Sequence, residues 1–289
     1  MDTITVNAYA KINLGLDVIR KREDGYHDVS MIMQSLDLHD SIVITKTATP
    51  TLSIKTNLSY LPNDQGNLVY KAASLFLTTI GSKDGLKINL EKRIPVAAGL
   101  AGGSSDAAAT LIGLNKLYQT GMSQGELKKL GVKLGADVPY CIMLGTALSE
   151  GIGELLTPLS PMPECTILLV KPDISVSTKY VYENLRLIDS LVHPNIPMMM
   201  QALSSGDLQQ LTRHMDNILQ SVTIKDYPII NDIKGKMKEL GALTSLMSGS
   251  GPTVFGIYKD YSLGKKAYNY FRKHQNYGKQ VFLTKPYWP

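Results

Sequence analysis

The chain has 289 residues, of which 44% are hydrophobic and 19% are charged, a composition typical of globular rather than disordered proteins. Its 30 lysines and arginines exceed its 25 aspartates and glutamates, which leaves a formal net charge of +5. The basic residues form short clusters rather than one stripe, so we expect no nucleic-acid partner. A small anionic molecule is the partner that this charge favours.

The sequence contains two cysteines, Cys141 and Cys165. Their number and spacing suit neither a disulfide framework nor a zinc site, which indicates a reducing compartment. The amino terminus lacks the basic segment and apolar run of a signal peptide, and no stretch long enough to span a bilayer is free of charged residues. We therefore expect a cytoplasmic protein with no membrane partner. The oligomeric state is not indicated.

The first predicted element is a strand over residues 6–18, because apolar and polar residues alternate there without a break. Lys11 and Asn13 fall side by side on its polar face. The sequence DGYH at residues 24–27 predicts a turn. Further strands are predicted over residues 31–36, 41–46 and 51–56.

Helical spacing replaces strand spacing over residues 67–80. The residues predicted to lie near one face of this helix are Leu68, Ala72, Leu75 and Leu77. A strand is predicted over 86–94, and helices are predicted over 107–118 and 123–135. The segment VAAGLAGGSSDAAATL at residues 96–111 therefore lies between a strand and the amino terminus of a helix.

Three prolines, Pro158, Pro161 and Pro163, exclude a regular element at residues 156–165. We place a boundary there between two domains, residues 1–160 and residues 161–289. Beyond it the predicted elements are a strand over 166–172, helices between 178 and 240, a strand, loop and strand over 247–258, a helix over 263–274 and a strand over 280–285. This mixed order of helices and strands predicts an α+β second domain.

The sequence GLAGGSSD at residues 99–106 has the properties of a phosphate-binding loop. Glycines permit backbone angles that other residues avoid, and the missing side chains let a phosphate approach the N–H groups at a helix amino terminus. Ser104 or Ser105 is predicted to cap the helix and to reach a phosphate or its metal ion. The alternative is a flexible loop followed by an ordinary cap. The motifs of P-loop proteins, protein kinases and dinucleotide-binding folds are absent from the sequence.

The segment PVAAGLAGGSSDAA at residues 95–108 resembles the phosphate loop of the GHMP kinase superfamily. The other similar segments are AYAKINLGLDV, DGYH, NLVYKAA, LGADVPYCIMLGTAL, GIGELLTPL and the glycine turn MSGSGPTVFG. The resemblance implies an α+β, two-domain GHMP-kinase fold. Its N-terminal part would be a ribosomal-protein-S5-domain-2-like α/β domain, and its C-terminal part a ferredoxin-like α/β domain.

The resemblance also implies an ATP-dependent small-molecule kinase that uses Mg²⁺. More narrowly, the chain is similar to superfamily members that phosphorylate the 2-hydroxyl of 4-diphosphocytidyl-2-C-methyl-D-erythritol, a cytidine diphosphate derivative of methylerythritol, in non-mevalonate isoprenoid synthesis. Two alternatives remain open. One is a GHMP kinase for a different small alcohol, such as homoserine or mevalonate, and the other is a nucleotide-binding homologue with a non-catalytic regulatory role.

By resemblance, Asp137 is the catalytic aspartate and Lys11 is its partner lysine. Phosphoryl transfer to an alcohol needs an acceptor for the hydroxyl proton and a cation that faces the γ-phosphate. Taken alone, an aspartate two positions before Pro139 also fits a helix cap or a turn. Lys11 also fits an exposed lysine on the polar face of a strand.

The resemblance implies binding sites for ATP and for the cytidine end of the substrate. The ATP-binding residues are Pro95, Val96, Ala97, Ala98, Gly99, Leu100, Ala101, Gly102, Gly103, Ser104, Ser105, Asn67 and Lys92. The substrate-binding residues are Asn13, Tyr26, His27, Thr178 and Tyr182. Aromatic faces stack on pyrimidines and histidine hydrogen-bonds a base edge, whereas caps, turns and helix packing are the alternative roles.

The chain departs from the family pattern within the phosphate loop. Many superfamily members carry glycine where this chain has Ala101, and the stretch containing Ala97 and Ala98 is often richer in glycine. An alanine is strained wherever the backbone needs a positive φ. The departure matters for phosphate contact if Ala101 has such an angle.

Overall fold

The structure is a computed structural model that describes residues 2–188 and 191–289. It consists of two compact units that alternate along the chain. Unit 1 comprises Met1–Ala10, Leu38–Val96 and Ala101–Met143. Unit 2 comprises Lys11–Asp37, Ala97–Leu100 and Leu144–Pro289. The predicted domain boundary at residue 160 stays a prediction. The predicted domains also contain residues 1 and 189–190, which lie outside the described residues.

The strands of unit 1 come from the first 91 residues. β3 (Leu52–Thr56) pairs in parallel with β4 (Gly85–Glu91), and β4 pairs antiparallel with the second half of β2 (His27–Thr47). β1 (Thr3–Lys21) also pairs with β2. Strands were predicted separately over 31–36 and 41–46, but β2 runs through both without a break. The strand includes Asp40, which is polar but fully buried.

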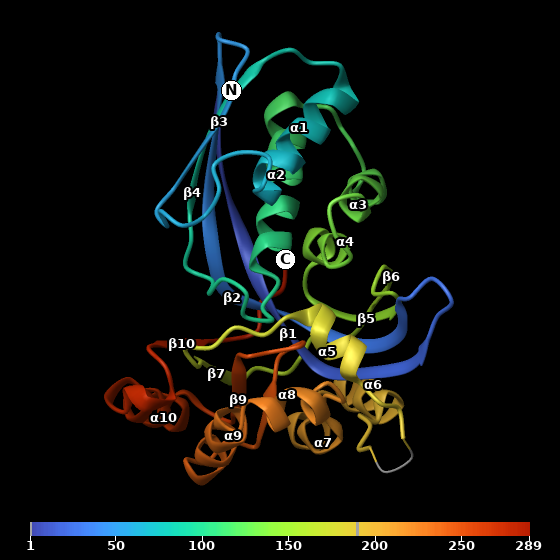
Figure 1. Ribbon diagram of the computed structural model, residues 1–289, viewed down its shortest axis with the longest axis vertical. Helices are drawn as coiled ribbons and strands as arrows, with labels where there is room; N and C mark the ends of the chain where they lie inside the picture. Colours follow the sequence, from blue (N-terminus) through green and yellow to red (C-terminus); the bar gives the residue numbers. More distant parts are fainter. Residues whose placement is uncertain (1, 189–190) are drawn as a thin grey trace. The chain divides into compact units, whose positions relative to one another are not determined.

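Among the described residues, unit 1 contains four helices: α1 (Leu68–Ile80), α2 (Gly102–Tyr118), α3 (Gln124–Val132) and α4 (Val138–Met143). α1 and α2 lie side by side (Figure 1). The buried residues of α1 are Val69, Ala72, Ala73 and Phe76. The helix was predicted, but the prediction of its apolar face was partly wrong. Of the four residues assigned to that face, Leu68, Leu75 and Leu77 are only half-buried.

Helix α2 approaches its sheet closely because of a glycine in its fourth turn. A Cβ atom on Gly113 would lie 3.1 Å from Ile44 Cδ1 and 3.3 Å from both Val6 methyl carbons. These distances are tighter than ordinary van der Waals contacts, so a larger residue would push the helix away from β1 and β2. Gly113 therefore fixes the position of the helix that follows the glycine-rich segment.

In unit 2, the first half of β2 pairs antiparallel with β5 (Thr146–Gly151), which pairs with β6 (Leu155–Pro158). The expectation that Pro158 excludes a regular element was wrong. Pro158 is the last residue of β6 and lies opposite Ala147. A proline is compatible with this position because β6 ends the strand order, so its outer side has no strand to pair with in the described sheet.

The second sheet of unit 2 is antiparallel with the order β10-β7-β9-β8. Its strands are β7 (Thr166–Lys171), β8 (Thr244–Met247), β9 (Val254–Tyr258) and β10 (Gln280–Thr284). Between β7 and β8 lie α5 (Thr178–Asn184), α6 (Ile196–Ser205), α7 (Leu208–His214), α8 (Gln220–Asp226) and α9 (Ile229–Glu239). Helices α9 and α10 (Tyr261–Lys273) pack against this sheet (Figure 1). This order of strands and helices is ferredoxin-like, as predicted.

Both cysteines are buried, with exposed fractions of 4% for Cys141 and 9% for Cys165. Burial raises the pKa of the Cys165 thiol to about 12. Across residues 2–188 and 191–289, every helix is too short or too polar to cross a membrane.

Candidate active site

The glycine-rich segment leads from β4 into α2, as predicted, and it has an unusual backbone. Ala97, Gly99 and Ala101 have φ angles of 50°, 75° and 55°. The left-handed region is accessible to glycine but costs other L-residues about 1–2 kcal/mol each. The departure from the family pattern at Ala101 therefore falls on a position where alanine is strained.

The amino terminus of α2 has the features of an anion site. Its N-cap residue is Ala101, and in the described part of the chain no side chain caps this helix. The N–H groups of the first turn of a helix lack helical partners and carry partial positive charge. They therefore suit a phosphate group.

The prediction that Ser104 or Ser105 caps α2 was wrong. Since the helix starts at Gly102, both serines lie inside it. Ser105 Oγ donates to Tyr9 O at 2.6 Å and lies 3.3 Å from Cys141 Sγ, and Ser105 is only 2% exposed. Its hydroxyl thus anchors α2 to β1. Ser104 is half-buried and lies one residue nearer the helix start.

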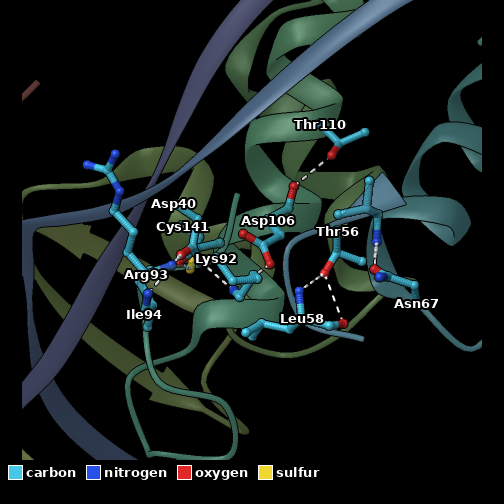
Figure 2. A network of polar contacts seen from close by, with 12 residues as sticks. Asp40, Thr56, Leu58, Asn67, Lys92, Arg93, Ile94, Asp106, Thr110 and Cys141 are labelled. Carbon is cyan, nitrogen blue, oxygen red and sulfur yellow. Dashed lines mark hydrogen bonds and ion pairs between the residues drawn. The ribbon is translucent and has the colours of Figure 1, made fainter. Parts of the chain in front are cut away.

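Lys92 lies between two buried carboxylates, as Figure 2 shows. Its ammonium forms ion pairs with Asp40 Oδ2 and, at 2.7 Å, with Asp106 Oδ2. Burial raises the pKa of Asp106 well above its usual value, although Lys92 opposes this effect. Burial also opposes the charge on Lys92, but the two carboxylates outweigh it and raise the pKa of Lys92.

Lys92 and Asn67 are the two predicted ATP-binding residues outside residues 95–105, and their polar groups form hydrogen bonds within unit 1. Asn57 pairs with the backbone of Lys92, accepting from its N–H at 2.8 Å and donating to its carbonyl at 3.1 Å. Asn67 caps α1, since its Oδ1 accepts from Val69 N at 2.9 Å, and its Nδ2 donates to Pro62 O. The alternative role of Asn67 as a helix cap is thus confirmed.

Asp137 directly precedes α4 and is half-buried. Its carbonyl accepts from Cys141 N at 3.0 Å, and every residue of α4 is buried. The helix therefore holds the backbone at Asp137 firmly. A Cβ atom on Gly135 would lie 4.0 Å from Ser104 Oγ, so the first turn of α2 lies close to the segment that precedes Asp137.

In unit 2, Lys11 and Asn13 share one side of β1, as the alternation predicts. Lys11 Nζ donates to Asn13 Oδ1 at 2.8 Å, and Lys11 N donates to Leu100 O at 3.2 Å. The exposed fractions are 5% for Lys11 and 0% for Asn13. The alternative of an exposed lysine is therefore excluded.

The turn between β8 and β9 contacts the middle of the glycine-rich segment. Ser248 Oγ donates to Gly99 O at 2.9 Å. A Cβ atom on Gly99 would lie 2.2 Å from Ser248 O, so only glycine fits there. Asn217, which is 1% exposed, donates from Nδ2 to both Met247 O and Gly249 O. The turn is thus held by a buried side chain.

Two of the residues predicted to bind the cytidine end of the substrate, His27 and Tyr182, contact each other in unit 2. The rings of His27 and Tyr182 have centroids 5.2 Å apart and are tilted by 43°. Thr178 Oγ1 shares a hydrogen bond of 2.8 Å with Ser250 Oγ, and Tyr26 is 62% exposed. Burial, with a smaller effect of Lys21, lowers the pKa of His27.

The predicted site residues are divided between the units. Unit 1 holds Asn67, Lys92, Pro95, Val96, residues 101–105 and Asp137, and unit 2 holds Lys11, Asn13, Tyr26, His27, residues 97–100, Thr178 and Tyr182. Sequence reasoning assigned no role to Asp40, Asp106 or Asn217. Asp40 left no local signal, because the sequence predicted it to lie between two strands and its partner Lys92 is 52 residues away.

Comparison with known families identifies the class of protein. The GHMP kinases N terminal domain matches residues 67–145, which include the glycine-rich segment and Asp137. The GHMP kinases C terminal domain matches residues 199–276, which include Asn217 and the turn at Ser248. The fold and both matches show a GHMP kinase, an enzyme class that phosphorylates small molecules with ATP as phosphate donor.

Two curated relatives define the family more closely. The 4-diphosphocytidyl-2-C-methyl-D-erythritol kinase of Lachnoclostridium phytofermentans is 58% identical over 285 residues, covering 99% of this chain and 98% of the relative. The enzyme of the same name from Lachnospira eligens is 49% identical over 289 residues and covers both chains completely. The chain therefore belongs to the family of 4-diphosphocytidyl-2-C-methyl-D-erythritol kinases.

A solved structure agrees with this assignment. The crystal structure of a 4-(cytidine 5'-diphospho)-2C-methyl-D-erythritol kinase superposes with a TM-score of 0.84 at 32% identity, covering 99% of this chain and all of the other. The predicted two-domain GHMP-kinase fold is thereby confirmed. The relatives support the specific kinase activity over a different alcohol substrate or a non-catalytic role.

Proposed function

We propose that this chain transfers the γ-phosphoryl group of ATP to the 2-hydroxyl of 4-diphosphocytidyl-2-C-methyl-D-erythritol. The observation that carries the proposal is the 58% identity to a kinase of that name over nearly the whole chain. The uncapped amino terminus of α2 supports it, because this helix end suits a triphosphate. We expect the reaction to take place in the cytoplasm, with neither nucleic acid nor membrane as a partner.

In this proposal Asp137 orients the hydroxyl and accepts its proton, while Lys11 stabilises the charge on the transferring phosphoryl group. Two features support the role of Lys11. Its ammonium is buried, and its hydrogen bond to Asn13 fixes its direction. The role of Asp137 is supported by its position immediately before the buried helix α4, because this helix holds the backbone from which the carboxylate extends.

Residues 95–105 would hold the triphosphate, with Asn67 and Lys92 next to the base. Since the polar groups of Asn67 and Lys92 are already bonded, we expect their nonpolar surfaces to contact adenine. Their hydrogen bonds would then hold the walls of the adenine site in place.

Mg²⁺ would enter with the nucleotide. It binds mainly through substrate phosphates, water and few protein ligands, and it would neutralise charge on the triphosphate. The described residues contain no cluster of three histidine, cysteine or acidic side chains for a metal, which is compatible with this mode. Ser104 suits a ligand role, whereas Ser105 does not, because its hydroxyl is buried against Tyr9 O.

The cytosine base would be bound by Tyr26, His27 and Tyr182, with Asn13 and Thr178 contacting more polar parts of the substrate. Since the rings of His27 and Tyr182 contact each other directly, the base would stack on an outer ring face rather than between them. Tyr26 is largely exposed and therefore accessible to such a base.

A substrate assay tests this function. Purified protein with Mg·ATP is expected to form one ADP for each cytidine-diphosphate alcohol phosphorylated, and to leave mevalonate and homoserine unchanged. Coupled ADP detection would measure turnover with each acceptor, and phosphorus NMR would identify the phosphorylated product. Equal rates with mevalonate, or no turnover with any acceptor, would refute the proposal.

A further inference from the structure

We propose that Asp40 and Asp106, joined through Lys92, are positioning residues of the nucleotide site. These three residues are called here the carboxylate clamp, and they hold both flanks of the glycine-rich segment at the spacing that binds the triphosphate. The proposal deepens the proposed function, and it rests on that function for the identity of the nucleotide as ATP.

The clamp holds the beginning of the segment through Asp40. Its Oδ1 accepts hydrogen bonds from the backbone N–H groups of Arg93 and, at 2.8 Å, Ile94. These residues lie between the end of β4 and Pro95. One fully buried carboxylate oxygen therefore fixes the direction in which the chain leaves the strand.

The clamp holds the end of the segment through Asp106, which lies in the second turn of α2. Asp106 Oδ2 accepts from Lys92 Nζ at 2.7 Å, and the same ammonium bonds to Asp40 Oδ2. A Cβ atom on Gly102 would lie 3.2 Å from this nitrogen. The ammonium thus lies against the first helical residue. Through Asp106, Lys92 and Asp40, α2 is tied to the residues that begin the segment (Figure 2).

The two carboxylates are not equivalent. Both oxygens of Asp40 are bonded, one to two N–H groups and the other to Lys92. Asp106 uses Oδ2, while its buried Oδ1 has no hydrogen-bond partner among residues 2–188 and 191–289. An asparagine at 106 can still accept from Lys92, whereas an asparagine at 40 must turn an N–H₂ group toward either Lys92 or the backbone N–H groups.

The clamp is tested by comparing Asp40→Asn with Asp106→Asn. For Asp40→Asn we expect the KM for ATP and the Kd for Mg·ADP to rise about tenfold, the effect of one lost charged hydrogen bond. The kcat at saturating ATP and the KM for the alcohol should stay within roughly threefold of the wild type. Asp106→Asn keeps the acceptor for Lys92 but loses the charge, so the KM for ATP and the Kd for Mg·ADP should rise by a smaller factor of about threefold.

Thr110→Val is the matched control. Thr110 is fully buried on the same helix, and its hydroxyl donates to Asp106 O one turn earlier. This variant should lower the unfolding midpoint without changing nucleotide affinity. If Asp40→Asn likewise lowers the midpoint and leaves both the KM for ATP and the Kd for Mg·ADP unchanged, the clamp is only structural and the proposal is overturned.

Two further measurements keep the test decisive. If Asp40→Asn does not fold, the double variant Asp40→Asn with Lys92→Met removes the donor that faces the new amide, and it should also weaken Mg·ADP binding about tenfold. Wild-type affinity in this variant would overturn the clamp. Calorimetry with Mg·ADP requires no turnover, so an inactive wild type would refute the proposed function and leave the clamp testable.

Discussion

Lys11 Nζ donates a hydrogen bond to Asn13 Oδ1 at 2.8 Å, and β1 buries both side chains. Asn13→Ala should lower kcat about tenfold or more, because the ammonium loses the acceptor that directs it. Asn7→Ala is the control, since Asn7 is an exposed residue on the same strand. Steady-state kinetics with both substrates decides the role. A rise only in the KM for the alcohol would show that Asn13 binds substrate without orienting Lys11.

Asp137→Asn should reduce kcat by at least about a hundredfold, as expected for the loss of a group that accepts a proton. The amide has the same shape but cannot take the hydroxyl proton. Mg·ADP affinity, measured by calorimetry, should be preserved. An unchanged kcat would assign Asp137 to a purely structural turn before α4.

Ala101→Gly should increase the free energy of unfolding by about 0.5–1 kcal/mol, because glycine relieves the strain of a φ of 55° and this gain exceeds its greater freedom in the unfolded chain. Ala98→Gly is the matched control, since the backbone of Ala98 is not in that region and its methyl group is buried. It should lose about 1–2 kcal/mol. Urea unfolding measures both, and equal losses would contradict the strain at Ala101.

Gly99→Ala should disrupt the contact between the glycine-rich segment and the turn at Ser248. The new Cβ atom would approach Ser248 O to 2.2 Å, where backbone rather than a flexible side chain must move. Gly121→Ala is the control, because Gly121 has a φ of 67° and the described atoms leave its Cβ position open. Gly121→Ala should lose about 1–2 kcal/mol, and Gly99→Ala should lose at least about 2 kcal/mol more. Similar losses would show that the segment moves freely away from the turn.

The affinity for the cytidine substrate should depend on the charge of His27. Its pKa is lowered from 6.5 by burial and by Lys21, so the ring is neutral at neutral pH and becomes protonated only below that value. Protonation removes the ring's only acceptor nitrogen. The KM for the alcohol should therefore be constant above pH 6.5 and rise as the pH falls below the lowered pKa. His27→Phe should abolish this dependence. If the variant and the wild type have the same pH profile, another group causes the pH dependence.

Elements with local apolar periodicity were predictable from the sequence. The alternation in β1 placed Lys11 beside Asn13, and the helical spacing after Asn67 located α1 and its cap. The boundaries of β2 were not predictable in this way. Asp40 lies within that strand, and its buried carboxylate is paired with Lys92, 52 residues further along the chain.

The same limit applies to the candidate site. Ser105 looked like a helix cap because its partner, Tyr9 O, lies 96 residues earlier and leaves no local pattern. The roles of Asp106 and Asn217 likewise depend on contacts between distant segments. The catalytic roles of Lys11 and Asp137 came from family resemblance, and they stay predictions.

The burial of both cysteines has a practical consequence for spectroscopy. The thiolate is the form that reacts with electrophilic reagents, and a thiol with a pKa of about 12 is almost fully protonated at neutral pH. Cys165 and Cys141, with 9% and 4% exposure, are both shielded from such reagents. A cysteine introduced at an exposed position, such as Tyr261→Cys, would accept a fluorophore or spin label selectively without removal of the natural thiols.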